Sequence, residues 1–212
     1  MCHASQLVFE TVCVSCCQPR GSEVLSGGGY CPRPHLSRTQ PMQGRKYAQA
    51  TALVVGVVVV SLALLRAIGV VSFALVGISE DGSWWGRLAH PFLHVGVLHA
   101  CLNVYVFWQL VFFFPLRLRH LLLAFFVAVT CPASIALWSL SLWHTAAASQ
   151  VVGLSGVVYV LLGWVVPMVT RRWRFCLSVM AWLIFGALVG TVAVGFHGYC
   201  FLAGIGAKII NN

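Results

Sequence analysis

The sequence predicts an all-α membrane protein in which six transmembrane helices follow a disordered N-terminal tail. Three observations support this fold class. Of the 212 residues, 60% are hydrophobic and only 8% are charged, whereas a soluble domain carries about 25% charged residues. The mean hydropathy is +0.91. The apolar residues after position 47 are also grouped in six segments, each long enough or nearly long enough to cross a membrane as a helix.

The N-terminal region, residues 1–47, is predicted to be a basic, cysteine-rich and disordered tail. It is rich in Gly, Pro and Ser and shows no hydrophobic periodicity. Five of the nine cysteines lie in its first 31 residues. Their spacing loosely resembles a zinc site, at Cys13, Cys16, Cys31 and His35, but the second well-spaced pair of ligands is missing. Acylation of Cys16 or Cys17 and a mitochondrial transit peptide remain open for this tail.

Residues 48–210 are predicted to form the six-span membrane domain. The spans are expected at residues 48–65, 91–114, 120–143, 151–169, 175–194 and 196–210. The last segment is only about 22 Å long at the helical rise, so it is expected to begin a little earlier or to lie in a thinned bilayer. Two tryptophans and Arg87 in the connection 66–89 indicate a loop that lies in the membrane interface.

The distribution of basic residues predicts the orientation of the spans. Arginine and lysine are concentrated in the tail, after the second and fourth spans and near the C-terminus, whereas the loops after the third and fifth spans contain none. By the positive-inside rule, both termini are expected on the cytosolic or matrix side. The net charge of +9 is thereby explained without a nucleic-acid partner.

The scarcity of acidic residues excludes several kinds of membrane chemistry. The four acids are Glu10, Glu23, Glu80 and Asp81, and none lies in an apolar segment. A two-aspartate protease, a Ser-His-Asp triad within the membrane and a carboxylate proton relay are therefore excluded. Chemistry at membrane depth must use Ser, His, Asn, Tyr, Cys or the backbone.

The fourth span carries the strongest candidate nucleophile. Ser155 lies between Gly153 and Gly156, and small residues on both sides of a serine allow other helices to approach it closely. Tyr159 follows one turn later on the same face. His197, at the start of the sixth span, is expected at a similar depth, where a neutral imidazole can accept the serine proton. Because no carboxylate is present, a Ser-His dyad is the available arrangement, with Tyr159 orienting the imidazole.

The second span supplies further polar side chains. His99 and Asn103 are one turn apart and share a helix face, and with the backbone N–H of Ser155 they are candidates to stabilise an oxyanion. His94 would lie on the opposite side of a straight helix, and it is expected to anchor the first loop together with His90. A zinc site formed by these histidines lacks a fitting carboxylate or thiolate, so no metal is expected.

Several motifs together resemble the rhomboid family of intramembrane serine proteases. The segment GLSGVVYVLLGW resembles the serine-bearing helix of bacterial members, and HPFLHVGVLHACLN is similar to the second-helix pattern of histidines followed by asparagine. WWGR resembles the Trp-Arg motif of the first loop. His197 with Gly204 matches the closing His-x-x-Gly-x-x-x-Gly motif in part, because Cys200 stands at its first glycine.

The resemblance implies a six-helix bundle that cleaves transmembrane segments of single-span proteins within the lipid bilayer. It makes Ser155 the nucleophile and His197 the general base and acid, and it implies no metal or cofactor. His99 and Asn103 would stabilise the oxyanion, and Tyr159 would support the imidazole. The expected location is the mitochondrial inner membrane, the plasma membrane or the secretory pathway. The substrate and the oligomeric state stay open.

Two other functions compete with this interpretation. Phe196 and Cys200 add bulk at a helix contact that should be close, and the family's usual acid near the end of the second span is missing, with Pro115 in that region. A catalytically silent protein that binds or helps translocate membrane clients is therefore the alternative. A small carrier or channel is disfavoured by the absence of sequence repeats and of charge within the spans.

Overall fold

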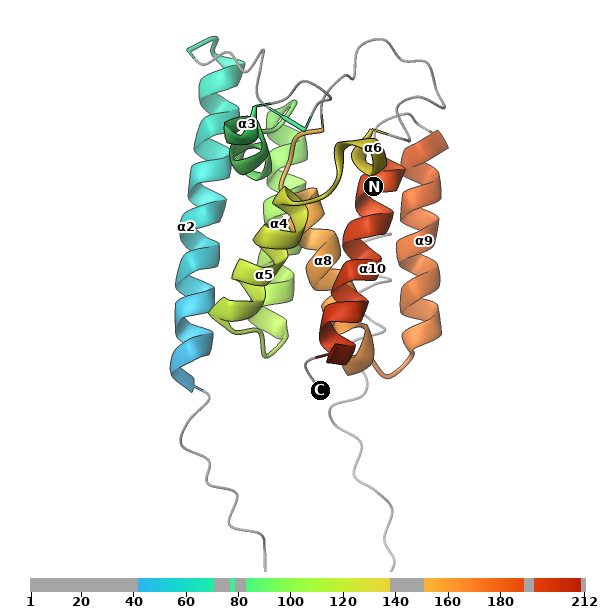
Figure 1. Cartoon of the computed structure of the whole chain (residues 1–212). Coiled ribbons are helices and arrows are strands. Elements are labelled where there is room, and N and C mark those ends of the chain that lie inside the picture. The colour runs from blue at the N-terminus through green and yellow to red at the C-terminus, as the bar shows by residue number, and fades with distance from the viewer. Residues whose placement is uncertain (1–41, 71–76, 79–82, 138–150, 189–192, 211–212) are drawn as a thin grey trace, which may run out of the picture.

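The structure, a computed structural model, describes residues 42–70, 77–78, 83–137, 151–188 and 193–210, and these form a bundle of helices (Figure 1). In chain order the elements are α2 (Met42–Ala67), α3 (Trp84–Ala89), the 3₁₀ helix η1 (His90–Phe92), α4 (Val97–Phe113), α5 (Leu118–Val129), α6 (Ala133–Ala136), α8 (Ser155–Val165), the 3₁₀ helix η2 (Val166–Met168), α9 (Arg172–Leu188) and α10 (Val194–Ile210). An isolated antiparallel bridge joins Ile78 to Val151.

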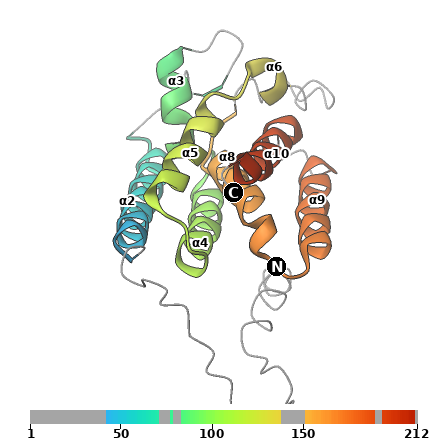
Figure 2. The same ribbon diagram turned by 60° about the horizontal axis from the view of Figure 1, so that its bottom comes forward.

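Helix α8 lies in the middle of the bundle, where it packs against α10, α5 and α4 (Figure 2). Nine of its residues are buried, because these neighbouring helices cover it on several sides. The outer helices are different. Large apolar side chains on α2 and α9, such as Val57 and Phe185, are exposed, as expected for surfaces that face lipid.

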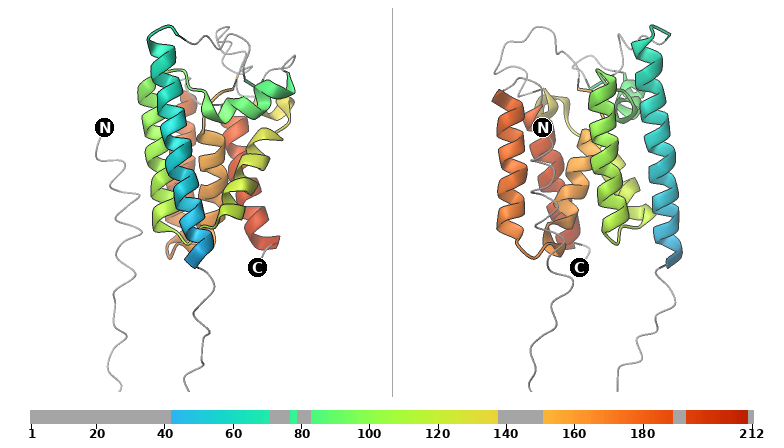
Figure 3. Two further views of the ribbon diagram at one scale, coloured as in Figure 1. Left: turned by 90° about the vertical axis from the view of Figure 1, so that its left-hand side faces the viewer. Right: turned by 180° about the vertical axis from the view of Figure 1, so that it is seen from behind.

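Helices α2 and α4 lie side by side (Figure 3). The Trp108 side chain of α4 fixes this contact, since its indole N–H donates a hydrogen bond of 2.8 Å to the Ala52 carbonyl oxygen of α2. Gly56 gives the ring its space, because a Cβ there would lie 2.6 Å from Cζ2 of Trp108. The contact joins the first helix to the helix that carries His99 and Asn103.

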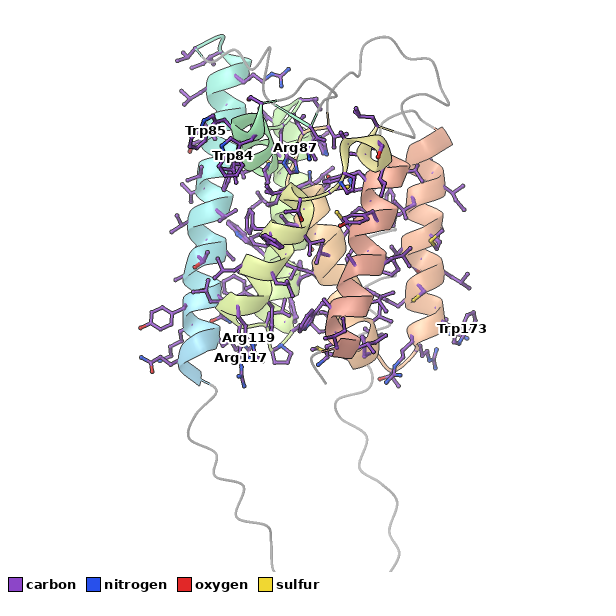
Figure 4. All side chains as sticks on the ribbon, in the orientation of Figure 1. Trp84, Trp85, Arg87, Arg117, Arg119 and Trp173 are labelled. Atoms are coloured by element: carbon purple, nitrogen blue, oxygen red, sulfur yellow. The ribbon has the colours of Figure 1, made fainter. Side chains whose placement is uncertain are left out.

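The two ends of the bundle carry different side chains (Figure 4). Arg117, Arg119 and Trp173 lie at one end, which we call the basic end, and Trp84 and Arg87 lie at the opposite end. Helix α10 finishes at the basic end, near the C-terminus (Figure 1).

By length and composition, one helix among the described residues can cross a membrane by itself, Gln43–Ala67. A second candidate is the pair Trp84–Phe92 and Val97–Phe113, which passes only if its two parts, bent by 79°, count as one span. Three further apolar helices are shorter, at Leu118–Val129, Ser155–Met168 and Val194–Ile210.

The prediction of one continuous second span over residues 91–114 was wrong. The chain forms η1, leaves helical geometry at Leu93 and begins α4 only at Val97. Gly96, in extended conformation, is the N-cap of α4. The break moves His94 out of the helix, so its expected position opposite Asn103 does not apply.

Other predicted boundaries also differ. The first helix begins at Met42 rather than at residue 48, and Arg45 in its first turns donates a hydrogen bond to the Phe112 carbonyl oxygen of α4. Helix α5 ends at Val129 instead of continuing to residue 143, because Pro132 cannot continue a helix. Residues 1–41 and 138–150 lie outside the described residues.

Two of the differences bear on the candidate site. Ser155 is the first residue of α8, since Gly153 and Leu154 form a turn before the helix. The last helix begins at Val194, two residues before the sequence-based boundary, as its short apparent length indicated. Both Ser155 and His197 therefore lie in the first turn of their helices.

Candidate active site

The structure brings Ser155 and His197 into direct contact. The Oγ atom of Ser155, on α8, lies 2.7 Å from Nε2 of His197, on α10. Both side chains are largely buried, with exposed fractions of 7% and 6%. Residues separated by 42 positions in the chain thus form a hydrogen-bonded pair between two helix N-termini.

The second ring nitrogen of His197 defines the direction of this hydrogen bond. Nδ1 lies 2.7 Å from the carbonyl oxygen of Ala193, one turn earlier in the chain. Because a carbonyl oxygen can only accept, Nδ1 carries the hydrogen and donates. In a neutral ring Nε2 is then the acceptor, and the Ser155 hydroxyl donates to it. The backbone oxygen of Ala193 orients the imidazole as a carboxylate does in a triad.

No residue pattern indicates this contact, because every residue has a carbonyl oxygen. It follows from the path of the chain into α10, which the backbone hydrogen bond from His197 N to Ala193 O also fixes, at 3.0 Å. Tyr159 contacts the same imidazole, as expected from its position one turn after Ser155. Its ring packs against the imidazole, with 4.6 Å between ring centroids and 59° between ring planes, while Ala193 provides the hydrogen bond.

The turn before Ser155 is held by two hydrogen bonds from its backbone. The N–H of Gly153 donates to the carbonyl oxygen of His90 at 2.8 Å, and the N–H of Leu154 donates to Nε2 of His94 at 3.1 Å. Gly153 has a φ of +126°, a backbone conformation that residues with a Cβ rarely adopt. His90 and His94 therefore anchor the segment that presents the serine.

His99 and Asn103 lie one turn apart on α4, the helix that packs against α8. The His99 ring is 5.3 Å from the His94 ring, centroid to centroid, and His94 in turn accepts the N–H of Leu154, the residue before Ser155. The Nδ2 atom of Asn103 is buried and has no hydrogen-bond partner among the described residues. A buried amide N–H without a partner is available to bind a group that enters the site.

Phe196 is accommodated next to the serine rather than between the two residues of the pair. Its ring fills the space above Gly156, where a Cβ would lie 2.4 Å from Cζ of Phe196 and 3.3 Å from Cβ of Ala128. Phe196 and Cys200 are both fully buried. The added bulk of these two residues therefore leaves the Ser155–His197 contact intact.

Helices α8 and α10 approach each other most closely at two glycines. A Cβ on Gly163 would lie 2.1 Å from the carbonyl oxygen of Phe201, and a Cβ on Gly204 would lie 2.1 Å from that of Val160. Gly204 belongs to the motif that the sequence indicated, whereas Gly163 was missed. Its only signal is its position eight residues after Ser155, in the same helix.

Within the described part of the chain, no group of three or more His, Cys, Asp or Glu side chains is arranged to hold a metal ion. The possible zinc site at Cys13, Cys16, Cys31 and His35 lies outside the described residues.

The protein is thus a helical bundle in which a buried serine and a buried histidine from two helices are in contact. The model of the rhomboid domain matches residues 81–209, which is more than half of the chain. The chain therefore belongs to the rhomboid family. No curated protein matches it significantly.

Family membership makes the chain an integral membrane protein. Rhomboid proteins are generally serine proteases, and they act on transmembrane substrates within the lipid bilayer. Helix α2, which packs against α4, precedes the matched range.

Proposed function

We propose that this protein is an intramembrane serine endopeptidase that cleaves transmembrane segments of single-span membrane proteins. The observation that carries the proposal is the 2.7 Å contact between Ser155 Oγ and His197 Nε2, in a ring whose other nitrogen donates to Ala193 O. A serine hydroxyl becomes an effective nucleophile when a base accepts its proton. The tautomer of His197 makes Nε2 that base.

The reaction proceeds in two halves. Ser155 Oγ attacks the scissile carbonyl carbon, and its proton passes to His197 Nε2. The imidazolium then gives this proton to the leaving amine as the C–N bond breaks, which leaves an acyl group on Ser155. A water molecule then attacks the acyl carbon and passes a proton to His197 Nε2. The bond between the acyl carbon and Ser155 Oγ breaks, Oγ takes that proton back from the imidazolium, and the new carboxyl end is released.

The negative oxygen that forms during each attack requires hydrogen-bond donors. Ser155 is the first residue of α8, and the first N–H groups of a helix have no partner within it. The helix dipole at this end also favours negative charge. Asn103, with its unpartnered Nδ2, and His99 would complete the set of donors.

We expect Asn103→Ala to lower kcat by roughly 10–1,000-fold, because one of several oxyanion donors is lost. Gln109→Ala, on the same helix, is the control. This substitution also removes a side-chain amide, but the unpartnered atom of Gln109 is the acceptor Oε1, which cannot donate to an oxyanion. Initial cleavage rates of a single-span substrate measure both variants. An unchanged rate for Asn103→Ala would exclude a role in oxyanion binding.

The six-span arrangement belongs to this proposal. The spans would be α2, α4, α5, α8, α9 and α10, with the basic end of the bundle and both termini on the cytosolic or matrix side. The shorter helices would cross where the bilayer is thinned around the protein. Residues before α2 would form a tail outside the membrane, and water would reach the dyad from the opposite side.

A fluorophosphonate probe tests the dyad without knowledge of the substrate. We expect the detergent-solubilised protein to be labelled on Ser155, because a serine activated by a base attacks the phosphorus. Ser155→Ala should show no labelling, and Ser178→Ala, whose exposed hydroxyl donates to Arg174 O on α9, should be labelled like the native chain. Intact mass spectrometry measures the adduct.

The same measurement distinguishes the alternative of a silent, client-binding protein. That alternative requires a folded chain without labelling, together with client retention that does not change in Ser155→Ala. The protease proposal would be contradicted if the native chain and Ser155→Ala were labelled equally. It would also be contradicted if the folded native chain were not labelled at all.

A further inference from the structure

At the basic end of the bundle, two donors point at the same buried imidazole. His120, in the first turn of α5, has an exposed fraction of 8%. The backbone N–H of Arg117 points at its Nδ1, at 3.0 Å. The Nε–H group of Arg119 points at its Nε2, at 3.2 Å.

One imidazole cannot accept at both nitrogens. A neutral ring has one N–H and one acceptor nitrogen, and a charged ring has no acceptor. Both the backbone N–H of Arg117 and the Nε–H of Arg119 can only donate, so only one of the two contacts is a true hydrogen bond. The Arg117 contact is shorter, 3.0 Å against 3.2 Å, and belongs to the backbone, which cannot rotate away as an arginine side chain can. We therefore assign Nδ1 as the acceptor and the hydrogen to Nε2. His120 Nε2–H and Arg119 Nε–H are then two donors that face each other over 3.2 Å. An oxygen acceptor beside them would satisfy both.

The neighbouring side chains add positive charge and a further donor. The Trp164 ring of α8 lies 4.6 Å from the His120 ring, between centroids, and Nζ of Lys208 on α10 lies 5.6 Å from the same indole. Trp164 is 4% exposed, and its Nε1 has no partner among the described residues. Residues of α5, α8 and α10 thus bring a guanidinium, an ammonium and an indole N–H around the adjacent rings of His120 and Trp164.

The described part of the chain supplies no carboxylate to this cluster. The four acidic residues of the protein, Glu10, Glu23, Glu80 and Asp81, all lie outside the described residues. The buried Nε1 of Trp164 has no acceptor among the described residues, and a buried donor without an acceptor retains its desolvation penalty. A bound anion with several oxygens would remove that penalty.

We propose that His120, Arg119, Trp164 and Lys208 form a binding site for the phosphate group of an anionic phospholipid. Arg117 and Arg119 are exposed at the end of the helix bundle (Figure 4), and the protein is an integral membrane protein. Lipid head groups gather at this level of a bilayer, and anionic lipids attract clusters of basic residues. Phosphate oxygens accept the charge-assisted hydrogen bonds that the cluster offers. The site is independent of the proposed protease activity.

The test uses the full chain in a neutral detergent. Phosphatidylglycerol, phosphatidylcholine and inorganic phosphate are added separately, and native mass spectrometry and thermal unfolding measure binding. Two variants weaken the site: the double substitution Arg119→Gln with Lys208→Gln, and His120→Asn, which retains an acceptor for the Arg117 N–H and lacks the Nε2–H. The control is Arg171→Gln with Arg174→Gln, which removes equal charge from exposed residues near the start of α9.

Phosphatidylglycerol is expected to bind the native chain and the control and to raise their unfolding temperature. Its affinity for the two site variants should fall roughly 10–100-fold, since charge-assisted hydrogen bonds are lost. Equal affinity of the native chain and the site variants would overturn the proposal. So would an equal loss in the control, which would indicate diffuse charge, or an equal response to inorganic phosphate, which would indicate a soluble ligand.

Discussion

Substitution of Ser155 or His197 by alanine is expected to lower the rate of substrate cleavage by about 10⁴-fold or more. The physical reason is the single hydrogen bond of 2.7 Å that joins them. Without the imidazole the serine retains its proton, and without the hydroxyl the imidazole has no nucleophile to activate. The initial rate of cleavage of a single-span substrate in reconstituted vesicles measures the effect.

The double variant provides the sharper test. Because the two residues act as one unit, Ser155→Ala with His197→Ala should be no slower than either single variant. Ser178→Ala, on the exposed surface of α9, should retain the native rate. Additive losses in the double variant, or substantial cleavage by Ser155→Ala, would show that the pair does not carry the reaction.

Replacement of Gly204 by alanine is expected to destabilise the protein by about 1–3 kcal/mol, and by more for larger side chains. The new Cβ would lie 2.1 Å from the Val160 carbonyl oxygen and 3.1 Å from the backbone nitrogen of Trp164. Backbone atoms cannot rotate away as the end of a side chain can, so α8 and α10 must separate. Thermal unfolding in detergent measures the loss.

Gly206 is a matched control two residues away on the same helix. A Cβ there meets nothing within 4 Å, so Gly206→Ala should leave stability unchanged or raise it by about 0.4–1 kcal/mol through the unfolded state. Because α8 carries Ser155 and α10 carries His197, Gly204→Ala should also lower kcat below its unfolding temperature. Equal unfolding temperatures for the two variants would show that the contact at Gly204 is not close.

Much of the site was accessible from residue types and spacing. The absence of carboxylates in the apolar segments left serine and histidine as the available pair, and the small residues around Ser155 indicated close helix contacts. The match of the rhomboid domain to residues 81–209 confirms the family that these motifs indicated. The roles of Ser155 and His197 remain predictions that the labelling and cleavage experiments test.

The predicted boundaries of the second and third spans were wrong because hydropathy does not indicate where the backbone changes direction. Residues 91–114 are apolar throughout, yet the chain bends by 79° between η1 and α4, and His94 thereby reaches the N–H of Leu154. The third segment is also apolar beyond Val129, but Pro132 ends the helix there. Hydropathy depends on composition, whereas these breaks depend on local backbone geometry.

The sequence by itself determined that this is a helical protein of the membrane with few possible catalytic groups, because side-chain chemistry and hydrophobicity are properties of each residue. Only the tertiary structure decided how those groups are used. The hydrogen bond from His197 to Ala193 O and the fit of Phe196 over Gly156 depend on helix positions to within about 1 Å. Such distances are set by packing among several helices at once.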